Sequence, residues 1–165
     1  MSTLFKTGSH LFRYRAALAA IAFVILVIAA DPRHSLAGHA AVLLGLGIRI
    51  WAAGYIGSGA RRRKFHAEYI VRDGPYRVLK HPLYFGNLFL VSGILLLYKP
   101  PRWLGLLYLA LFVVIYGSII VSEIDYLKGK PARETCYKLC NLRGESSTWL
   151  TVGFVYLVLF VLLKI

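Results

Sequence analysis

Five long apolar blocks constrain the fold of this chain more than any other feature of its sequence. They lie at residues 14–30, 36 to about 57, 82–98, 103 to about 123, and 148–163. A helix crosses the hydrocarbon core of a bilayer with about 20 apolar residues, within a range of about 17–25. Three blocks are at or just below this range, so we expect flanking residues to complete them. The blocks lack the period-two alternation of transmembrane β-barrels, and only helices and closed barrels span membranes.

We therefore predict an all-α polytopic membrane protein with five transmembrane helices and a single domain over residues 1–165. The composition agrees with this prediction, because 58% of the residues are hydrophobic and only 16% are charged. Charged residues make up about 25% of an ordinary soluble domain. The composition thus excludes a soluble globular enzyme, a disordered tail and a disulfide-stapled secreted domain.

The basic residues predict the orientation of the chain in the membrane. The formal net charge is +13, and 15 of the 20 Lys and Arg residues lie in the N-terminal segment or in two long connections, at about 58–81 and 124–147. Basic loops face the cytoplasm and attract anionic lipid headgroups. We therefore place the N-terminus and both connections in the cytoplasm and the C-terminus outside. The membrane would be a bacterial or archaeal inner membrane, or the endoplasmic reticulum of a eukaryote.

Because the basic residues flank apolar blocks, we expect the bilayer, and no nucleic acid, as the partner of this charge. The two long connections are the only sizeable surface outside the membrane, so we expect the function to lie on this cytoplasmic face. Oligomeric state does not follow from the sequence. Small residues at Gly54, Gly57, Ser58 and Gly59 could pack helices closely, within one chain or between two.

Arg49 and Glu123 are charged residues in or beside apolar blocks. A charge inside a span costs about 2.5–3.5 kcal/mol on insertion scales, so it usually faces the bundle interior or an aqueous cavity. Arg49 either lines a functional pocket, or it forms a structural ion pair or extends toward the cytoplasmic end of its helix. Glu123 closes the fourth block, where the helix macrodipole disfavours a carboxylate. Its position favours a specific partner, such as Arg49, Lys80 or a cationic ligand, over a role in solubility alone.

Residues 72–87 carry the densest polar signal, at the start of the third block. Gly74-Pro75 is typical of a turn, and Pro82 fits the first position of a helix. His81, Tyr84 and Asn87 follow at a spacing that places them on roughly one helical face. The backbone N–H groups of a helix start could receive a ligand carboxylate. An interfacial aromatic belt with a capped helix start is the alternative interpretation.

The two cysteines, Cys136 and Cys140, lie in the connection at 124–147. A cytoplasmic location predicts reduced thiols. Two cysteines are only half of a zinc site, so we expect no metal here. We expect Cys136, Leu139 and Cys140 to form the apolar stripe of a short helix against the membrane.

Three segments of the sequence resemble a known superfamily of membrane enzymes. Gly74-Pro75-Tyr76-Arg77 and Lys80-His81-Pro82, with Tyr84 and Gly86, resemble the "GPYR…RHPxYxG" signature of the isoprenylcysteine carboxyl methyltransferase and phospholipid methyltransferase superfamily. Residues 47–52, which include Arg49, are similar to its "G-x-x-R-x-W-A" helix. Glu123 to Leu127 resembles its "E-E-x-x-L" element. The resemblance covers about residues 45–127.

The resemblance implies an integral membrane methyltransferase that uses S-adenosylmethionine and a lipophilic acceptor, which enters from the bilayer. The acceptor group would be a carboxylate, an amine or a thiol. The residues implied to bind the cofactor are Gly74, Tyr76, His81, Pro82, Tyr84, Gly86, Asn87 and Glu123. The residues implied to take part in catalysis are Glu123, His81, Lys80 and Arg49.

Two positions depart from the pattern of the superfamily. Lys80 replaces the usual Arg, which removes the planar bidentate fork of the guanidinium. Ile124 replaces the second Glu of the acidic pair. Two alternatives to the methyltransferase remain open, and Ile124 supports the second of them. One is an NADPH-dependent membrane reductase related to sterol reductases, with the basic run 61–64 near the cofactor phosphate. The other is a non-catalytic membrane protein that binds a lipid or a partner.

Overall fold

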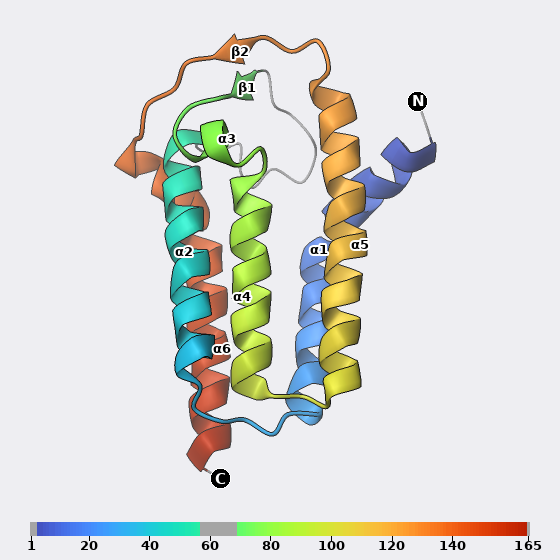
Figure 1. Ribbon diagram of the computed structural model, residues 1–165, viewed down its shortest axis with the longest axis vertical. Coiled ribbons are helices and arrows are strands. Elements are labelled where there is room, and N and C mark those ends of the chain that lie inside the picture. Colours follow the sequence, from blue (N-terminus) through green and yellow to red (C-terminus); the bar gives the residue numbers. More distant parts are fainter. Residues whose placement is uncertain (1–2, 57–68, 165) are drawn as a thin grey trace.

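The computed structural model describes residues 3–56 and 69–164 of the chain. This part is mostly helical, and five long helices run side by side in a bundle (Figure 1). The long helices are α1 (Thr3–Ile28), α2 (Leu36–Ile56), α4 (Pro82–Tyr98), α5 (Arg102–Leu127) and α6 (Ser146–Lys164). The short elements are β1 (Ile70–Val71), α3 (Pro75–Val78), β2 (Ala132–Arg133) and the 3-10 helix η2 (Leu139–Glu145).

By length and apolar composition, three helical segments in the described part of the chain are able to cross a membrane. They are Leu36–Ile56, Arg102–Leu127 and Leu139–Lys164, the last being η2 and α6 together. The apolar part of α1, Ala17–Ile28, and helix α4 are shorter. The helical fold is thus confirmed and spanning length is shown for three helices, while five transmembrane helices stay a prediction.

Two predicted boundaries differ from the structure. Helix α1 begins at Thr3 rather than near residue 14, and α5 continues past Glu123 to Leu127. Both extensions contain polar residues, which an apolar block does not include although a helix tolerates them at its ends. Glu123 therefore lies one turn before the end of its helix and does not close it.

The short connections and the long connections lie at opposite ends of the bundle (Figure 1). At the short end, the backbone N–H groups of Asp31 and Arg33 donate to the carbonyl oxygens of Tyr98 and Leu97, at 3.0 and 2.9 Å. These carbonyls end α4 and have no partner inside their helix. The connection between α1 and α2 therefore caps the C-terminal end of α4 and fixes both helices against it.

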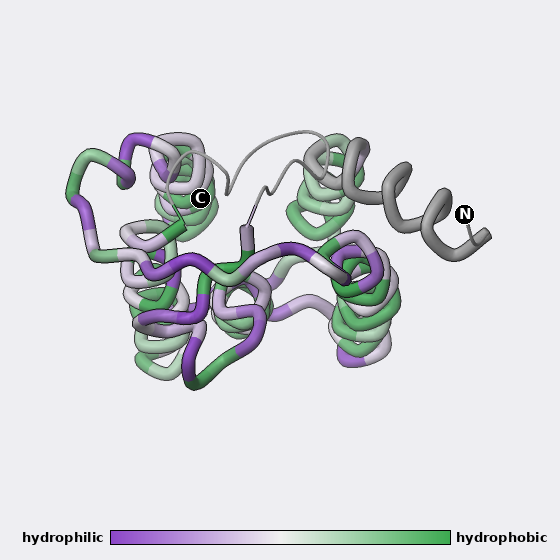
Figure 2. Tube along the Cα trace, turned by 90° about the horizontal axis from the view of Figure 1, so that it is seen from above, coloured by the Kyte–Doolittle hydropathy of each residue, from purple (hydrophilic) through white to green (hydrophobic). Residues whose placement is uncertain are grey.

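The described parts of the two long connections are tied together at the other end. Strand β1 pairs with β2 in parallel, with Ile70 opposite Ala132. The Asp73 carboxylate accepts a hydrogen bond from the backbone N–H of Thr135 at 2.5 Å. Hydrophilic residues concentrate along these connections when the bundle is viewed from this end (Figure 2). The basic run 61–64 and the small residues Gly57, Ser58 and Gly59 lie outside the described residues.

The cysteines do not share a helix. Cys136 lies in an irregular segment, and η2 begins only at Leu139. The prediction that Cys136 shares a short helix with Leu139 and Cys140 is therefore wrong. Backbone bonding explains this difference, because the N–H of Lys138 donates to the carbonyl of Gly54 on α2 at 3.0 Å and holds the segment extended. Both cysteines are free thiols and exposed.

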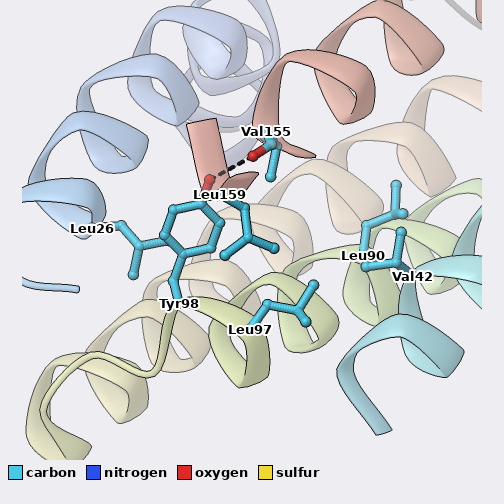
Figure 3. Close-up of a cluster of buried hydrophobic side chains, with 7 residues drawn as sticks. All are labelled: Leu26, Val42, Leu90, Leu97, Tyr98, Val155 and Leu159. Carbon is cyan, nitrogen blue, oxygen red and sulfur yellow. Dashed lines mark hydrogen bonds between the residues drawn. The ribbon is translucent and has the colours of Figure 1, made fainter. Parts of the chain in front are cut away.

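Helix α4 lies at the centre of the apolar core (Figure 3). Seven buried side chains from α1, α2, α4 and α6 form this core: Leu26, Val42, Leu90, Leu97, Tyr98, Val155 and Leu159. Tyr98 is fully buried and its hydroxyl donates to the carbonyl of Val155 at 2.6 Å. A buried tyrosine needs such a partner, so this bond fixes α6 against α4.

Glycines bring the backbones of α2 and α4 into direct contact. A Cβ atom on Gly45 would lie 2.8 Å from the carbonyl oxygen of Gly86 and 2.9 Å from the backbone nitrogen of Leu90. A Cβ atom on Gly93 would lie 2.8 Å from the carbonyl oxygen of Gly38. Close approach through small residues is the usual way for helices to associate in membranes. The contact places the Arg49 side chain next to the first two turns of α4.

The substitution Gly45→Ala tests this contact. The new methyl group would meet backbone atoms, which cannot rotate away, so we expect a loss of about 1–3 kcal/mol of stability. Gly47→Ala on the same helix is the matched control, since a Cβ there has nothing within 4 Å. Unfolding in detergent would measure both variants, and equal stabilities would contradict the close contact.

Candidate functional site

A tight turn positions the residues that precede α4. Gly74 has a φ of 57°, and a Cβ atom there would lie 2.4 Å from the ring of Tyr55. Glycine alone combines this left-handed conformation with this lack of space. The following residue, Pro75, is buried and begins the short helix α3. The turn thus directs the next side chain, Tyr76, back toward the bundle.

The Tyr76 hydroxyl is buried and has no hydrogen-bond partner among the described residues. Burial raises the pKa of Tyr76, and the nearby charge of Glu123 raises it further. The phenol therefore stays protonated at physiological pH and keeps a hydrogen to donate. A buried polar group without a partner is costly, which makes this hydroxyl a candidate group for binding a ligand.

The Glu123 carboxylate on α5 is the second such group. Its Oε2 atom lies 3.3 Å from Nδ1 of His81, a distance that suits an ion pair when the imidazole is protonated. The contact is not aligned as a hydrogen bond, and Oε2 is buried without any other partner in the described part of the chain. Two side chains were expected as partners of Glu123, Arg49 and Lys80, and neither contacts it. The charged neighbour that the structure shows is His81.

Aromatic rings form one wall beside this carboxylate. The His81 ring stacks on Tyr84 with centroids 5.8 Å apart, and Tyr84 meets the edge of Tyr116 at 5.4 Å. The Asn87 Nδ2 atom donates to the Tyr116 hydroxyl at 3.2 Å. His81, Tyr84 and Asn87 therefore share one face of α4, as their spacing predicts. Sequence reasoning missed Tyr116, although it lies two helical turns before Glu123 and hence on the same face of α5.

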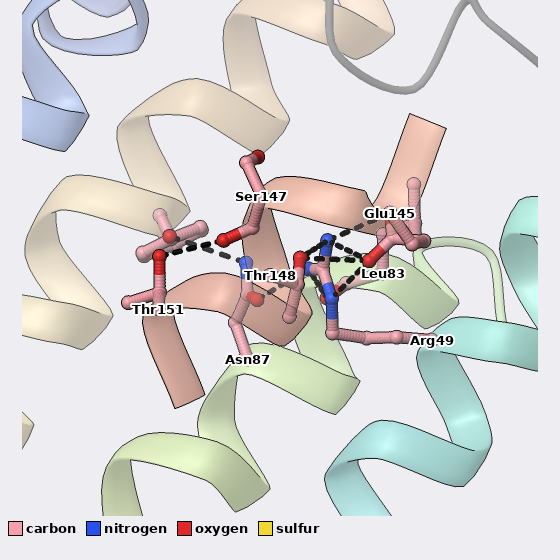
Figure 4. Close-up of polar contacts among 8 residues, drawn as sticks. Arg49, Leu83, Asn87, Glu145, Ser147, Thr148 and Thr151 are labelled. Atoms are coloured by element: carbon pink, nitrogen blue, oxygen red, sulfur yellow. Dashed lines mark hydrogen bonds and ion pairs between the residues drawn. The ribbon is translucent and has the colours of Figure 1, made fainter. Parts of the chain in front are cut away.

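Arg49 forms a buried ion pair with Glu145, the last residue of η2 (Figure 4). Its Nη2 atom lies 2.7 Å from Oε2 and 2.9 Å from Oε1, and its Nε atom lies 2.9 Å from Oε2. Thr148 donates to the same carboxylate at 2.8 Å. Arg49 also donates to the Asn87 side-chain oxygen and to the Leu83 carbonyl. The ion pair that the sequence offered as one interpretation of Arg49 is thus observed.

Glu145 was not among the candidate residues, because it lies in a polar connection outside the apolar blocks. One signal could have found it. The chain holds only seven Asp and Glu residues, and a buried Arg49 requires one of them.

The other candidates lie around this centre. Pro82 is buried at the start of α4, where it fits the first helical turn as predicted. Gly86 faces α2, and a Cβ there would lie 2.6 Å from Cγ of Arg49, so this glycine serves helix packing. Lys80 and Ile124 are both exposed.

A family model described as "Phospholipid methyltransferase" matches residues 34–129, which is more than half of the chain. The chain belongs to the phospholipid methyltransferase family. Neither a curated protein nor a solved structure matches it. The matched region runs from the start of α2 to just beyond the end of α5 and therefore contains Arg49, Tyr76, His81 and Glu123, but not Glu145. Membership implies methyltransferase activity in a membrane, which agrees with the apolar helices.

Removing one partner of the buried Arg49–Glu145 pair tests how much the pair contributes to the stability of the fold. Glu145→Ala leaves the Arg49 guanidinium buried without a counter-charge, and we expect a loss of about 3–5 kcal/mol of stability. Asp31→Ala is the control, because Asp31 pairs with Arg33 on the surface, where a pair contributes at most about 1 kcal/mol. Equal melting temperatures for the two variants would contradict a buried pair.

Proposed function

We propose that this protein is an S-adenosylmethionine-dependent methyltransferase whose acceptor is lipophilic and reacts at the cytoplasmic boundary of the membrane. The observation that carries the proposal is a pair of buried oxygen atoms that have no hydrogen bond within the described residues, Tyr76 Oη and Glu123 Oε2. They lie where α3, α4 and α5 meet, within the region that defines the family. Buried polar atoms with a purely structural role usually have hydrogen-bond partners within the protein.

The residues present suit the chemistry of this cofactor. Bound S-adenosylmethionine would supply the methyl group from a positively charged sulfonium, and it also carries an ammonium, a carboxylate and ribose hydroxyls. The Glu123 carboxylate is suited to the ammonium or the hydroxyls, and the Tyr76 hydroxyl can donate to an oxygen. The positive end of the α4 dipole, at His81 and Pro82, is suited to the carboxylate. Gly74 shapes the turn that holds Tyr76 in place.

The roles of the side chains follow from this arrangement. His81, Tyr84 and Asn87 form a wall that orients the reactants and reduces their contact with water. For an amine acceptor, the Glu123–His81 pair is placed to remove a proton. Exposed Lys80 can hold an anionic part of a lipid acceptor, such as a phosphate, at the membrane surface. Arg49 is engaged by Glu145, so we assign it to the support of the site rather than to the substrate.

The proposal also includes the placement in the membrane. All five long helices would span the bilayer, with the N-terminus and both long connections in the cytoplasm and the C-terminus outside. The arrangement of the connections supports this, because the long basic ones share one end of the bundle. The apolar outer surface of the helices would let a lipophilic acceptor enter from the bilayer.

Titration calorimetry with S-adenosylhomocysteine tests the proposed site. We expect the purified protein to bind it, and Glu123→Gln and Tyr76→Phe to weaken binding about tenfold to a hundredfold, because hydrogen bonds that involve charge contribute about 1.5–3 kcal/mol. Tyr76→Phe should not lower the melting temperature of the ligand-free protein, since it removes a hydroxyl that has no partner. A lower melting temperature would show that the hydroxyl is structural.

Asp125→Asn and Tyr137→Phe are the matched controls, because both residues are exposed at the same end of the bundle. They should leave affinity unchanged. NADPH is titrated in parallel. Binding of NADPH alone would favour a reductase, and binding of neither ligand by a folded protein would favour a non-catalytic role.

Labelling of the native cysteines tests the orientation. Cys136 and Cys140 are exposed in the connection at 124–147 and are the only cysteines in the chain. A membrane-impermeant maleimide should label them only after intact cells are permeabilised. The variant with both replaced by Ser and with His34→Cys should be labelled in intact cells, because His34 lies at the other end of the bundle. The opposite result would invert the orientation.

A further inference from the structure

The Arg49–Glu145 pair joins a segment outside the family-matched region to the proposed site. Glu145 is fully buried and Arg49 is 8% exposed, and the two lie 96 residues apart in the chain. Replacing a buried ion pair by apolar side chains of similar volume is often neutral or stabilising, so stability alone is a weak reason for such a pair. Its other contacts indicate a second role.

Arg49 fixes the orientation of the Asn87 side chain. A guanidinium has only donors, so the contact from Arg49 Nη1 requires the Asn87 oxygen to point toward it. The Asn87 Nδ2 group then points away from Arg49, and it donates to the Tyr116 hydroxyl at 3.2 Å. An Asn87 side chain released from Arg49 could turn over and present its oxygen to Tyr116.

Tyr116 belongs to the aromatic wall of the proposed site. Its ring meets Tyr84 at 5.4 Å, and Tyr84 stacks on His81 at 5.8 Å. His81 in turn lies 3.3 Å from Glu123. A continuous series of contacts thus runs from Glu145 at the end of η2 through α2 and the facing side chains of α4 and α5 to the carboxylate on α5.

We propose that Glu145 is a positioning residue for the cofactor site, acting through Arg49 and the fixed amide of Asn87 on the wall formed by Tyr116, Tyr84 and His81. The proposal rests on the proposed function, because the affected ligand is the cofactor. It assigns a functional role to the segment that follows residue 129, which the family match does not include.

A double-mutant cycle separates positioning from stability. The variants are Arg49→Met, Glu145→Leu and the two together, and the readouts are the melting temperature and the affinity for S-adenosylhomocysteine by calorimetry. Each single variant should melt well below the wild type, because it leaves one buried charge without its partner. The double variant should regain most of the melting temperature yet bind about tenfold more weakly than the wild type, because Asn87 is no longer held.

The outcomes distinguish the two proposals. Recovery of both stability and affinity in the double variant, to within about twofold of the wild type, would overturn the positioning role and leave the proposed function intact. Failure of the wild type itself to bind S-adenosylhomocysteine would overturn the proposed function and this inference with it. Asp31→Asn with Arg33→Gln is the control, because it removes an exposed pair and should change neither readout.

Glu145→Gln covers the case in which the double variant does not fold. It keeps the size of the side chain and one acceptor oxygen but removes the charge that holds Arg49. We expect a weaker affinity with a smaller loss of melting temperature than in Glu145→Leu. An unchanged affinity in a folded Glu145→Gln protein would also overturn the positioning role.

Discussion

The backbone contact between α2 and α4 is the constraint on which the rest of this structure depends. Glycines at Gly38, Gly45, Gly86 and Gly93 remove the side chains that would separate the two helices. The first turns of α4 therefore lie against Arg49, close enough for its guanidinium to reach Leu83 and Asn87. A wider separation would leave the arginine without these partners in a low-dielectric environment, where an unpaired charge is costly.

Polar groups in this protein are satisfied very unevenly. The Arg49 guanidinium donates hydrogen bonds to a carboxylate, a side-chain amide, a hydroxyl and a backbone carbonyl. On α3 and α5, by contrast, the Tyr76 hydroxyl oxygen and one Glu123 carboxylate oxygen are buried without hydrogen-bond partners in the described residues. Binding groups need such a hydrogen-bonded support around them, and the proposed site has one in the contacts of Arg49.

The sequence predicts the helices well because the length of an apolar block is a local property. Helix α2 ends within a residue of its predicted boundary, and Pro82 marks the start of α4. The shared face of His81, Tyr84 and Asn87 follows from helical periodicity. Pairings between distant segments do not follow in this way. Glu145, the β1–β2 pair and the contact of Gly45 with Gly86 depend on how the helices are arranged, and no single segment encodes that. Of the small residues singled out at the end of α2, the structure describes Gly54, and a Cβ atom there would meet the ring of Tyr137 rather than α4.

The large separation of Arg49 and Glu145 along the chain has a consequence for biosynthesis. Ribosomes add about 5–20 residues per second, so the 96 residues between the two partners take on the order of 5–20 s to synthesise. Throughout this interval α2 carries an arginine whose counter-ion does not yet exist. Insertion of the early helices must therefore proceed through an intermediate that shields this charge with water, lipid headgroups or the insertion machinery until Glu145 has been synthesised.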